Sequence, residues 1–166
     1  MERSTIIKKL SKYFATHELV GKATYEFFEA RNEDSWQVFD TDTLHCLLIM
    51  REGIGLPFSV NNWFWGGTYD ERGFRSNIQY IVRSKTNKGI IYLSGHPLGK
   101  AIDFQVDGMG AEDVRNWIED HAKEFPCKIR LEWKKKNKEG VYKPITWVHY
   151  DTKQIDSKPK IYKFNI

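Results

Sequence analysis

Residues 94–103 read SGHPLGKAID and residues 146–151 read TWVHYD, and these two stretches decide which fold and site the chain can build. They hold His96, Asp103 and His149. Imidazole nitrogen and carboxylate oxygen are the ligands of catalytic zinc, and such a site uses three protein groups so that water can take the fourth position. The two stretches therefore predict a zinc site that supports hydrolysis.

The surroundings of Asp103 indicate that its carboxylate is partly buried. The small, apolar residues Ala101 and Ile102 lead into it, as in a strand that packs on a core. A buried charge is unfavourable unless it is paired or bound to a metal. Lys100 is the only neighbouring cation in the sequence, so this segment is expected to need a cation from elsewhere.

The stretch around His149 has the composition of a strand. Residues 145–150, ITWVHY, are β-branched and aromatic. Side chains alternate between the two faces of a strand, so Trp147, His149 and Asp151 share one face and Thr146 lies on the other. Asp151 is therefore expected to reach the same site as His149.

The spaced pattern SxHxxGxAxD followed by WVHxD resembles the zinc peptidases of the hedgehog/DD-peptidase superfamily, which cleave bonds in bacterial cell-wall peptides. Three further segments are similar to that family: LSKYFATHELV at 10–20, LIMREGIGLPFSVNN at 48–62, and the arginine-bearing turn GFRS at 73–76. The resemblance covers roughly residues 10–152. It is greatest to the small, single-domain versions found in phages and their bacterial hosts.

The resemblance implies an α+β fold in which an antiparallel sheet is flanked by helices and carries the zinc site. It implies that His96, Asp103 and His149 bind Zn²⁺, and that the substrate is a peptidoglycan stem or cross-link peptide. The family includes both carboxypeptidases and endopeptidases, and the sequence does not decide between them. Several relatives place a Glu three residues before the last His, where this chain has Thr146.

Two carboxylates can replace that Glu as the catalytic proton carrier. Glu132, in the strand-like IRLEW, would lie beside TWVHY if the two strands form a hairpin, whereas Asp151 follows His149 on the same face. A general base must lie within hydrogen-bond reach of the attacking water. We favour Glu132, although it could instead be a solvated partner of Arg130, and Asp151 could instead orient a ligand histidine.

Arg75 and Ser94 are the predicted substrate-binding residues. The arginine of this turn lies near the substrate in the relatives, and a guanidinium can hold a peptide carboxylate through two hydrogen bonds. The alternative is that Arg75 braces its loop through an ion pair. Ser94 precedes the ligand loop, but a serine in a turn more often caps its own backbone.

The remaining pattern predicts which segments flank the site. We expect a helix over residues 43–52 with Asp42 as its N-cap and an amphipathic helix over 110–125 that Pro126 ends. A short helix is expected within 76–85. Strands are expected at the start of 56–65 and over 89–95, 101–106, 127–133 and 145–150.

Length and composition favour one compact domain. With 166 residues, 40% of them hydrophobic, the chain can bury a single sizeable core. We expect one domain over 1–166, with the motif-bearing core at about 10–152 and a basic tail at 153–166. MERSTIIKKL lacks the apolar run of a signal peptide, and no stretch has the length of a membrane span. The expectation is a monomer, cytoplasmic at synthesis, that acts on the cell wall after release, as a phage lysin does.

Two other functions stay open, one suggested by the basic charge and one by Thr146. The net charge is +4, and lysines crowd residues 134–138 and the tail. Such a surface favours association with an anionic cell wall or with nucleic acid. Nucleic acid is disfavoured because most of the six Trp residues lie in apolar patterns typical of a core. The second alternative is a catalytically inactive, zinc-stabilised binding module of the same fold, which the Thr at position 146 favours.

Overall fold

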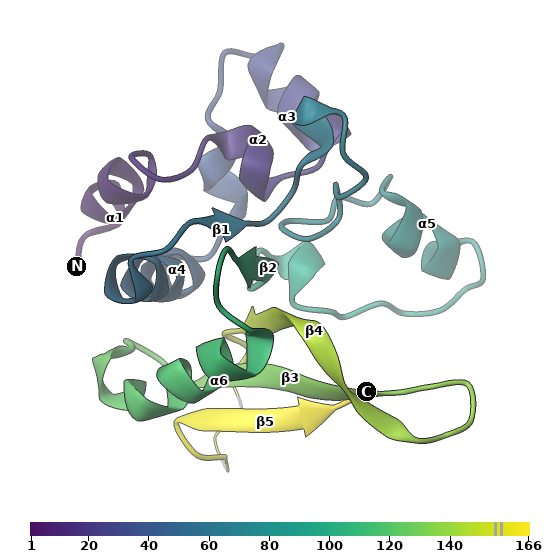
Figure 1. Cartoon of the computed structure of the whole chain (residues 1–166). Helices are drawn as coiled ribbons and strands as arrows, with labels where there is room; N and C mark the ends of the chain where they lie inside the picture. The colour runs from purple at the N-terminus through teal and green to yellow at the C-terminus, as the bar shows by residue number, and fades with distance from the viewer. Residues whose placement is uncertain (155, 157) are drawn as a thin grey trace.

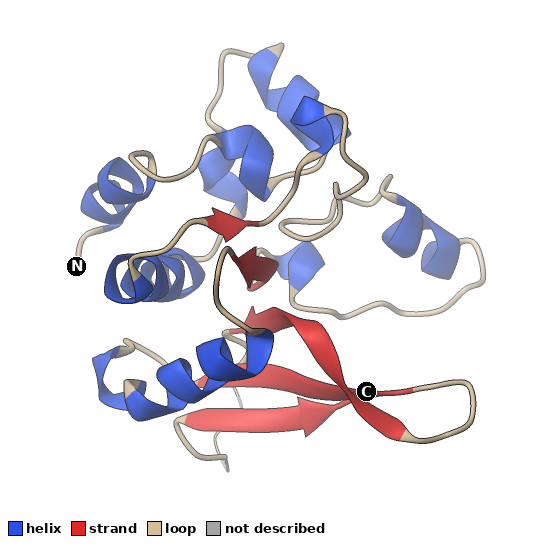
Figure 2. Cartoon of the chain, viewed as in Figure 1, coloured by secondary structure: helices blue, strands red, loops and turns tan. Residues whose placement is uncertain are grey.

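The chain folds around a five-stranded sheet with the order β1-β2-β4-β3-β5 (Figures 1 and 2). This computed structural model describes residues 1–154, 156 and 158–166. The strands are β1 (Phe58–Ser59), β2 (Ala101–Val106), β3 (Ile129–Lys136), β4 (Tyr142–Asp151) and β5 (Ile161–Asn165). All neighbouring pairs are antiparallel except β3 and β5, which are parallel. The predicted α+β architecture is therefore confirmed in its coarse form.

Helices surround this sheet. The α-helices are α1 (Arg3–Leu10), α2 (Thr16–Leu19), α3 (Lys22–Glu29), α4 (Thr41–Ile54), α5 (Tyr80–Thr86) and α6 (Ala111–Asp120). Short 3₁₀ turns lie at η1 (Ser35–Val38), η2 (Trp63–Trp65), η3 (His96–Leu98) and η4 (Ala122–Glu124). In Figure 1 the helices α1–α5 and β1 form the upper half, and α6 lies beside β3–β5 in the lower half. Within the described residues, no helix combines the length and apolarity needed to cross a bilayer.

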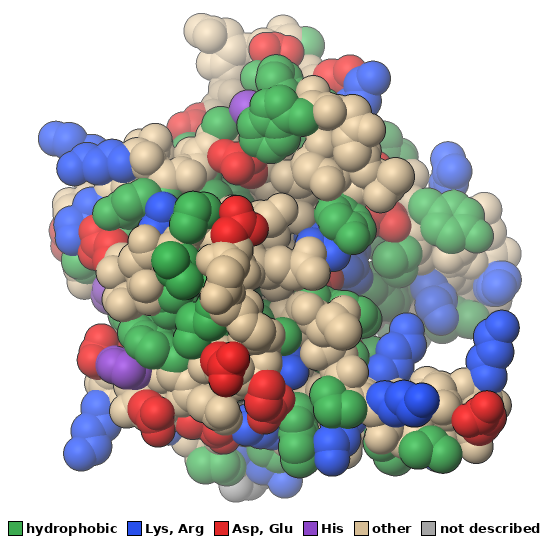
Figure 3. Space-filling view, viewed as in Figure 1, with side chains coloured by type: hydrophobic (Ala, Val, Ile, Leu, Met, Phe, Trp, Pro, Cys, Tyr) green, Lys and Arg blue, Asp and Glu red, His purple; other side chains and the backbone are tan. Residues whose placement is uncertain are grey.

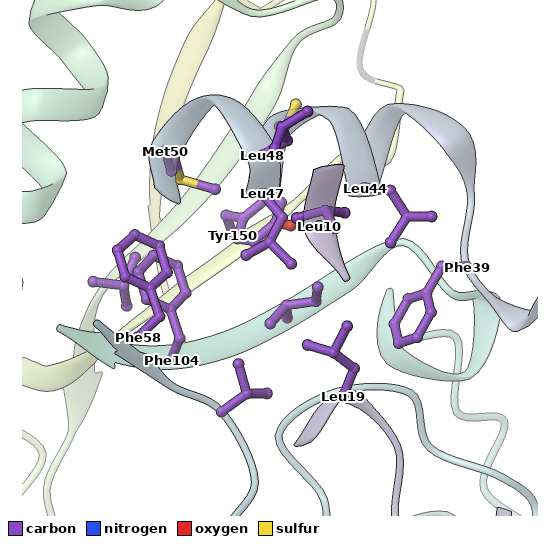
Figure 4. Close-up of a cluster of buried hydrophobic side chains, with 14 of the residues drawn as sticks. Leu10, Leu19, Phe39, Leu44, Leu47, Leu48, Met50, Phe58, Phe104 and Tyr150 are labelled. Atoms are coloured by element: carbon purple, nitrogen blue, oxygen red, sulfur yellow. The ribbon is translucent and has the colours of Figure 1, made fainter. Parts of the chain in front are cut away.

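The apolar core lies between one face of the sheet and helices α1, α4 and α6. In Figure 4, side chains of α4 pack over β2 and meet the aromatic rings of Phe58, Phe104 and Tyr150. Phe58 and Phe104 stack with ring centroids 4.5 Å apart. The Tyr150 hydroxyl satisfies its hydrogen-bonding need by donating to the Thr43 carbonyl of α4. Because this face is filled, the polar side chains of the same strands must lie on the other face.

Two helix boundaries differ from the prediction. Asp40, not Asp42, is the N-cap of α4, because the Asp40 carboxylate accepts a hydrogen bond from the Asp42 amide at 3.0 Å. Helix α6 ends at Asp120, well before Pro126. There the His121 imidazole donates from Nδ1 to the Trp117 carbonyl oxygen at 2.7 Å, and the His121 backbone leaves the helical conformation. His121 is therefore the C-cap residue of α6, and the helix is shorter than the predicted range of 110–125.

The strand predicted over residues 89–95 is wrong. This segment runs without regular structure into η3, and its apolar side chains Ile90, Ile91 and Leu93 are 46%, 83% and 67% exposed. Strand β2 already pairs with β1 on one side and β4 on the other. Strand β1 covers only Gln105 and Val106, and the Asp103 amide on that side donates to the Arg72 carbonyl at 2.7 Å, so a different segment occupies the edge that residues 89–95 would need.

The tail expected over residues 153–166 contains a strand that the prediction missed. Residues Ile161–Asn165 form β5 and pair with β3, which brings Phe164 opposite Glu132. The alternation in IYKFN was the available signal for this strand. The basic composition of the segment instead favours a solvated tail, and the pairing depends on the open edge of β3.

Candidate metal centre

His96, Asp103 and His149 converge at one point on the polar face of the sheet. Their potential ligand atoms lie within 4.8 Å of one another, and all three side chains are buried. Asp103 on β2 and His149 on β4 are direct partners in the antiparallel register. His96 approaches from η3. The predicted convergence is confirmed, and the group can hold a metal ion.

The turn after His96 has a backbone that requires glycine. Gly99 adopts φ +66°, and a Cβ there would lie 1.9 Å from the Val38 carbonyl oxygen.

The His96 Nδ1 atom lies 2.8 Å from the Gly73 carbonyl oxygen, and Nε2 lies 3.3 Å from Asp103 Oδ2. A neutral imidazole that donates from Nδ1 keeps its lone pair on Nε2. The Gly73 carbonyl thus fixes the ring so that a ligand nitrogen faces Asp103.

His149 is held between two carboxylates. Its Nδ1 lies 2.6 Å from Asp103 Oδ1, and its Nε2 lies 3.4 Å from Asp151 Oδ2. Asp151 is itself fixed, because Arg130 donates to both of its oxygens at 2.8 Å and the Lys153 amide donates to Oδ1 at 3.1 Å. Asp151 therefore orients the ring of His149 and has little freedom to carry a proton.

The electrostatics of the three ligands depend on one another. Burial alone would lower the pKa of His149, but the Asp103 carboxylate outweighs burial and raises that pKa to about 9. Burial likewise opposes ionisation of Asp103, yet the two imidazoles hold its pKa well below the ordinary value. Burial lowers the pKa of His96. Without a metal, a proton on His149 thus balances the Asp103 charge, and a cation bound between them would replace that proton.

Arg75 is the cation that Asp103 was expected to need. Its Nη2 donates to Asp103 Oδ2 at 2.9 Å, its Nη1 donates to the Tyr92 hydroxyl at 2.8 Å, and its Nε donates to the Glu71 carbonyl. Lys100, the neighbour in sequence, instead lies 3.6 Å from Asp40. Each of the three guanidinium nitrogens thus donates to a protein atom, which is the geometry of a brace for Asp103.

Among the described acidic side chains of the site, Glu132 has an oxygen without a hydrogen-bond partner. It lies directly opposite His149 in the β3–β4 register, as the predicted hairpin requires. The side chain is buried, and within the described residues its Oε1 has no hydrogen-bond partner. Burial raises the pKa of this carboxyl. Arg130, its suggested partner, pairs with Asp151 instead, so Glu132 is not a solvated ion-pair residue.

Ser94 and Thr146 are the other two positions that the sequence analysis named. Ser94 Oγ accepts a long hydrogen bond of 3.5 Å from the His96 amide and lines the site cavity, so it helps to shape the ligand turn. Thr146 and Val148 line a separate small cavity, whereas Trp147 and His149 face the metal centre. A side chain at position 146 therefore points away from the metal centre, and the missing Glu leaves no gap in the site.

A cavity of about 530 Å³ opens over the metal centre. It is lined by the three ligands together with Glu132 and Asp151, and by side chains that the sequence did not single out: Ile81, Lys85, Tyr92, Arg130, Lys135, Trp147, Lys153, Phe164 and Ile166. Figure 3 shows Lys and Arg side chains on both sides of an opening between the region of α5 and the β3–β4 turn. These residues come from distant segments, so no local motif marks them.

No family model, curated protein or solved structure matches this chain. The geometry of the site and the sequence motifs are therefore the basis for assigning a function.

Proposed function

We propose that this chain is a zinc-dependent peptidase of the hedgehog/DD-peptidase superfamily that hydrolyses peptidoglycan stem or cross-link peptides. The observation that carries the proposal is the buried His96, Asp103 and His149 group next to a carboxylate, Glu132, that has an unpartnered oxygen. Metal ligands and a proton carrier are the two parts that metal-assisted hydrolysis requires.

The donor set fits zinc. Two imidazole nitrogens and one carboxylate oxygen are a common protein contribution to a catalytic zinc site, which keeps one position open. The Gly73 carbonyl and Asp151 each hold the non-ligating nitrogen of one histidine, as is usual for metal-bound histidines. When bound, zinc supplies Lewis acidity, which lowers the pKa of water and polarises a carbonyl.

Glu132 is the residue that we assign to proton transfer. As a carboxylate it takes a proton from the attacking water, and as a carboxylic acid it returns that proton to the leaving amine, so that water and an amide give a carboxylate and an amine. A raised pKa suits this exchange, because the group must both accept and donate near neutral pH. Burial among the strands supplies that raised pKa.

Arg75 and Asp151 act through the ligands. Arg75 holds the Asp103 carboxylate, and Asp151, clamped by Arg130, holds His149. We therefore assign both as positioning residues. The residues that face a bound peptide are then those of the cavity rim, which is basic at Lys85, Lys135 and Lys153.

The substrate class rests on the sequence motifs. The basic rim is compatible with it, because stem peptides carry carboxylates and the cell wall is anionic. A phage lysin that reaches the wall after release is the setting we propose.

Purified protein, freed of metal and reloaded with zinc, tests the proposal on isolated peptidoglycan by the appearance of new amine termini. We expect release by the zinc-loaded protein, and a loss of about 10²–10⁴-fold in Glu132→Gln at unchanged zinc content. Glu139→Gln, on the exposed β3–β4 turn, is the matched control and should retain activity. Full activity of Glu132→Gln would overturn the role of this residue.

A zinc-stabilised binding module without catalysis is the second candidate. The sequence raises this candidate through Thr146, where several relatives have Glu, although position 146 faces away from the metal centre. If this function is correct, we expect the wild-type protein to bind one zinc per chain and to be retained on peptidoglycan, but to release no new amine termini. Zinc content measured together with amine release separates the two functions.

A further inference from the structure

A second hollow adjoins the metal centre. It has a volume of about 290 Å³ and is lined by Thr68, Tyr69, Asp70, Glu71, Arg72, Arg75, Ile81, Asp103 and Trp147. Four of these residues, Arg75, Ile81, Asp103 and Trp147, also line the cavity over the metal centre. The two hollows therefore meet at the Asp103 ligand and extend from it in different directions.

The wall of the second hollow is held in place by specific contacts. The Arg72 guanidinium lies 3.4 Å from the centroid of the Tyr69 ring and donates to Gln105 Oε1 of β2 at 3.0 Å. The Tyr69 amide donates to Asn62 Oδ1 at 2.8 Å. The Tyr69 side chain is still 40% exposed. It thus offers a positioned aromatic surface to a ligand.

The two hollows differ in charge. The cavity over the metal centre has Lys85, Lys135 and Lys153 on its rim, none of which forms an ion pair with a described residue. The second hollow has mixed charge, with the carboxylates of Asp70, Glu71 and Asp103 and the guanidinium groups of Arg72 and Arg75. A chain that crosses from one to the other therefore meets a basic, lysine-bearing half and then a half of mixed charge that includes the Asp70 carboxylate.

The centre of this path lacks an arginine that is free to hold a terminal carboxylate. Arg75 is bound to Asp103, Tyr92 and Glu71, and Arg130 is bound to Asp151. Arg72, which lines the second hollow, donates to Gln105 and lies over the Tyr69 ring. An enzyme that removes one terminal residue needs a cation that closes one end of its site. Here space continues on both sides of the metal centre.

We propose that the metal centre lies in the middle of a groove open at both ends and that the chain cleaves internal peptide bonds. The proposal rests on the proposed peptidase function. A carboxylate-bearing segment of the peptide lies in the basic half, and an amide- or ammonium-bearing segment lies against Tyr69 and Asp70. The reaction is the same hydrolysis, with peptide on both sides of the scissile bond.

Binding to the zinc-loaded Glu132→Gln protein tests the groove without turnover. The probes are a synthetic stem peptide with free ends and the same peptide acetylated at its N-terminus and amidated at its C-terminus, with binding followed by calorimetry. We expect dissociation constants within about threefold of each other, because no single terminal charge is required. A loss of about tenfold or more on amidation would overturn the proposal, because it would show a dedicated carboxylate anchor.

Tyr69→Ala tests the second hollow directly in the same background. We expect about tenfold weaker binding of both peptides at unchanged zinc content, since an aromatic contact is lost. Tyr142→Ala is the matched control, because Tyr142 is similarly exposed (45%) and its ring also lies under a cation, Lys136, but outside both hollows. Equal binding by the Tyr69 and Tyr142 variants would overturn the assignment of this hollow.

Turnover of peptidoglycan by the wild-type protein separates failure of this proposal from failure of the peptidase function. Mass spectrometry of the products should show fragments cut at an internal bond. Release of single terminal amino acids alone overturns the open groove and leaves the peptidase function standing. No cleavage of any kind overturns both.

Discussion

The two faces of the central sheet both bury side chains but are built from opposite chemistry. On one face of β2, β3 and β4 lie apolar side chains that are at most 1% exposed: Ile102, Phe104, Leu131, Val148 and Tyr150. On the other face the same strands bury ionisable side chains that are at most 7% exposed: Asp103, Glu132, His149 and Asp151. The strands are shared, so the difference lies in the side chains alone.

This difference shows which face stabilises the fold and which serves the site. Burial of apolar area contributes roughly 25 cal/mol per Å², whereas a buried charge costs stability unless it is paired. Arg75 and Arg130 provide such pairing for Asp103 and Asp151. On the polar face, ion pairs therefore offset the free-energy cost of burying charged groups. Glu132 is the buried acid that lacks such a pair among the described residues.

Removing a ring from the apolar face should have the largest effect on stability. Phe104 is fully buried and stacks on Phe58, so Phe104→Ala should lower the free energy of unfolding by about 4 kcal/mol. Urea denaturation measures this loss. Phe27→Ala, at a ring that is 48% exposed, should cost about 0.5 kcal/mol or less. A loss of similar size in both variants would contradict the assignment of the core face.

Breaking the Arg130–Asp151 pair should have the next largest effect. Arg130→Ala leaves a carboxylate that is 1% exposed without its main partner, and we expect a loss of about 3 kcal/mol. The double variant Arg130→Ala/Asp151→Ala should recover part of this loss, since the orphan charge is gone. Lys9→Ala breaks the exposed Lys9–Glu52 pair and should change the free energy of unfolding by less than about 1 kcal/mol. If the losses in Arg130→Ala and in Asp151→Ala simply added in the double variant, the two residues would not form a coupled buried pair.

The metal-free protein should lose stability as pH rises. The pKa of His149 is raised in the folded state from 6.5 to about 9, so its proton stabilises the fold fully below pH 6.5 and that contribution is lost as pH rises towards 9. The loss should be on the order of 3 kcal/mol. Thermal unfolding at a series of pH values, in metal-free and zinc-loaded protein, measures it. Zinc loading should remove the trend, because the metal replaces the proton; an identical trend in both forms would contradict the metal site.

Glu132→Gln should have the smallest effect on stability and a large effect on activity. The amide keeps the shape of the side chain and removes a charge that has an unpartnered oxygen, so the free energy of unfolding should change by less than about 1 kcal/mol. Urea denaturation measures the change. A loss of several kcal/mol would show that Glu132 stabilises the polar face instead of serving the reaction.

The strand pairing that builds the site was largely predictable, and the supporting contacts were not. Alternation in TWVHYD placed His149 and Asp151 on one face, and the lysine-rich loop indicated the hairpin that brings Glu132 opposite His149. The pairing of Arg75 with Asp103 spans 28 residues and carries no local periodicity. The strand predicted over 89–95 failed for the same reason, because sheet-edge availability is a property of the whole fold.

The sequence by itself determined the ligand types, their spacing and the alternation of side chains on each strand, because these depend only on local backbone geometry. The tertiary structure alone decided which carboxylate is free. Arg130 and the Lys153 amide engage Asp151, while Glu132 keeps an unpartnered oxygen in the same cavity. Both acids occur in strand-like sequence, and only the packing of β3 against β4 and β5 fixes which partners each can reach.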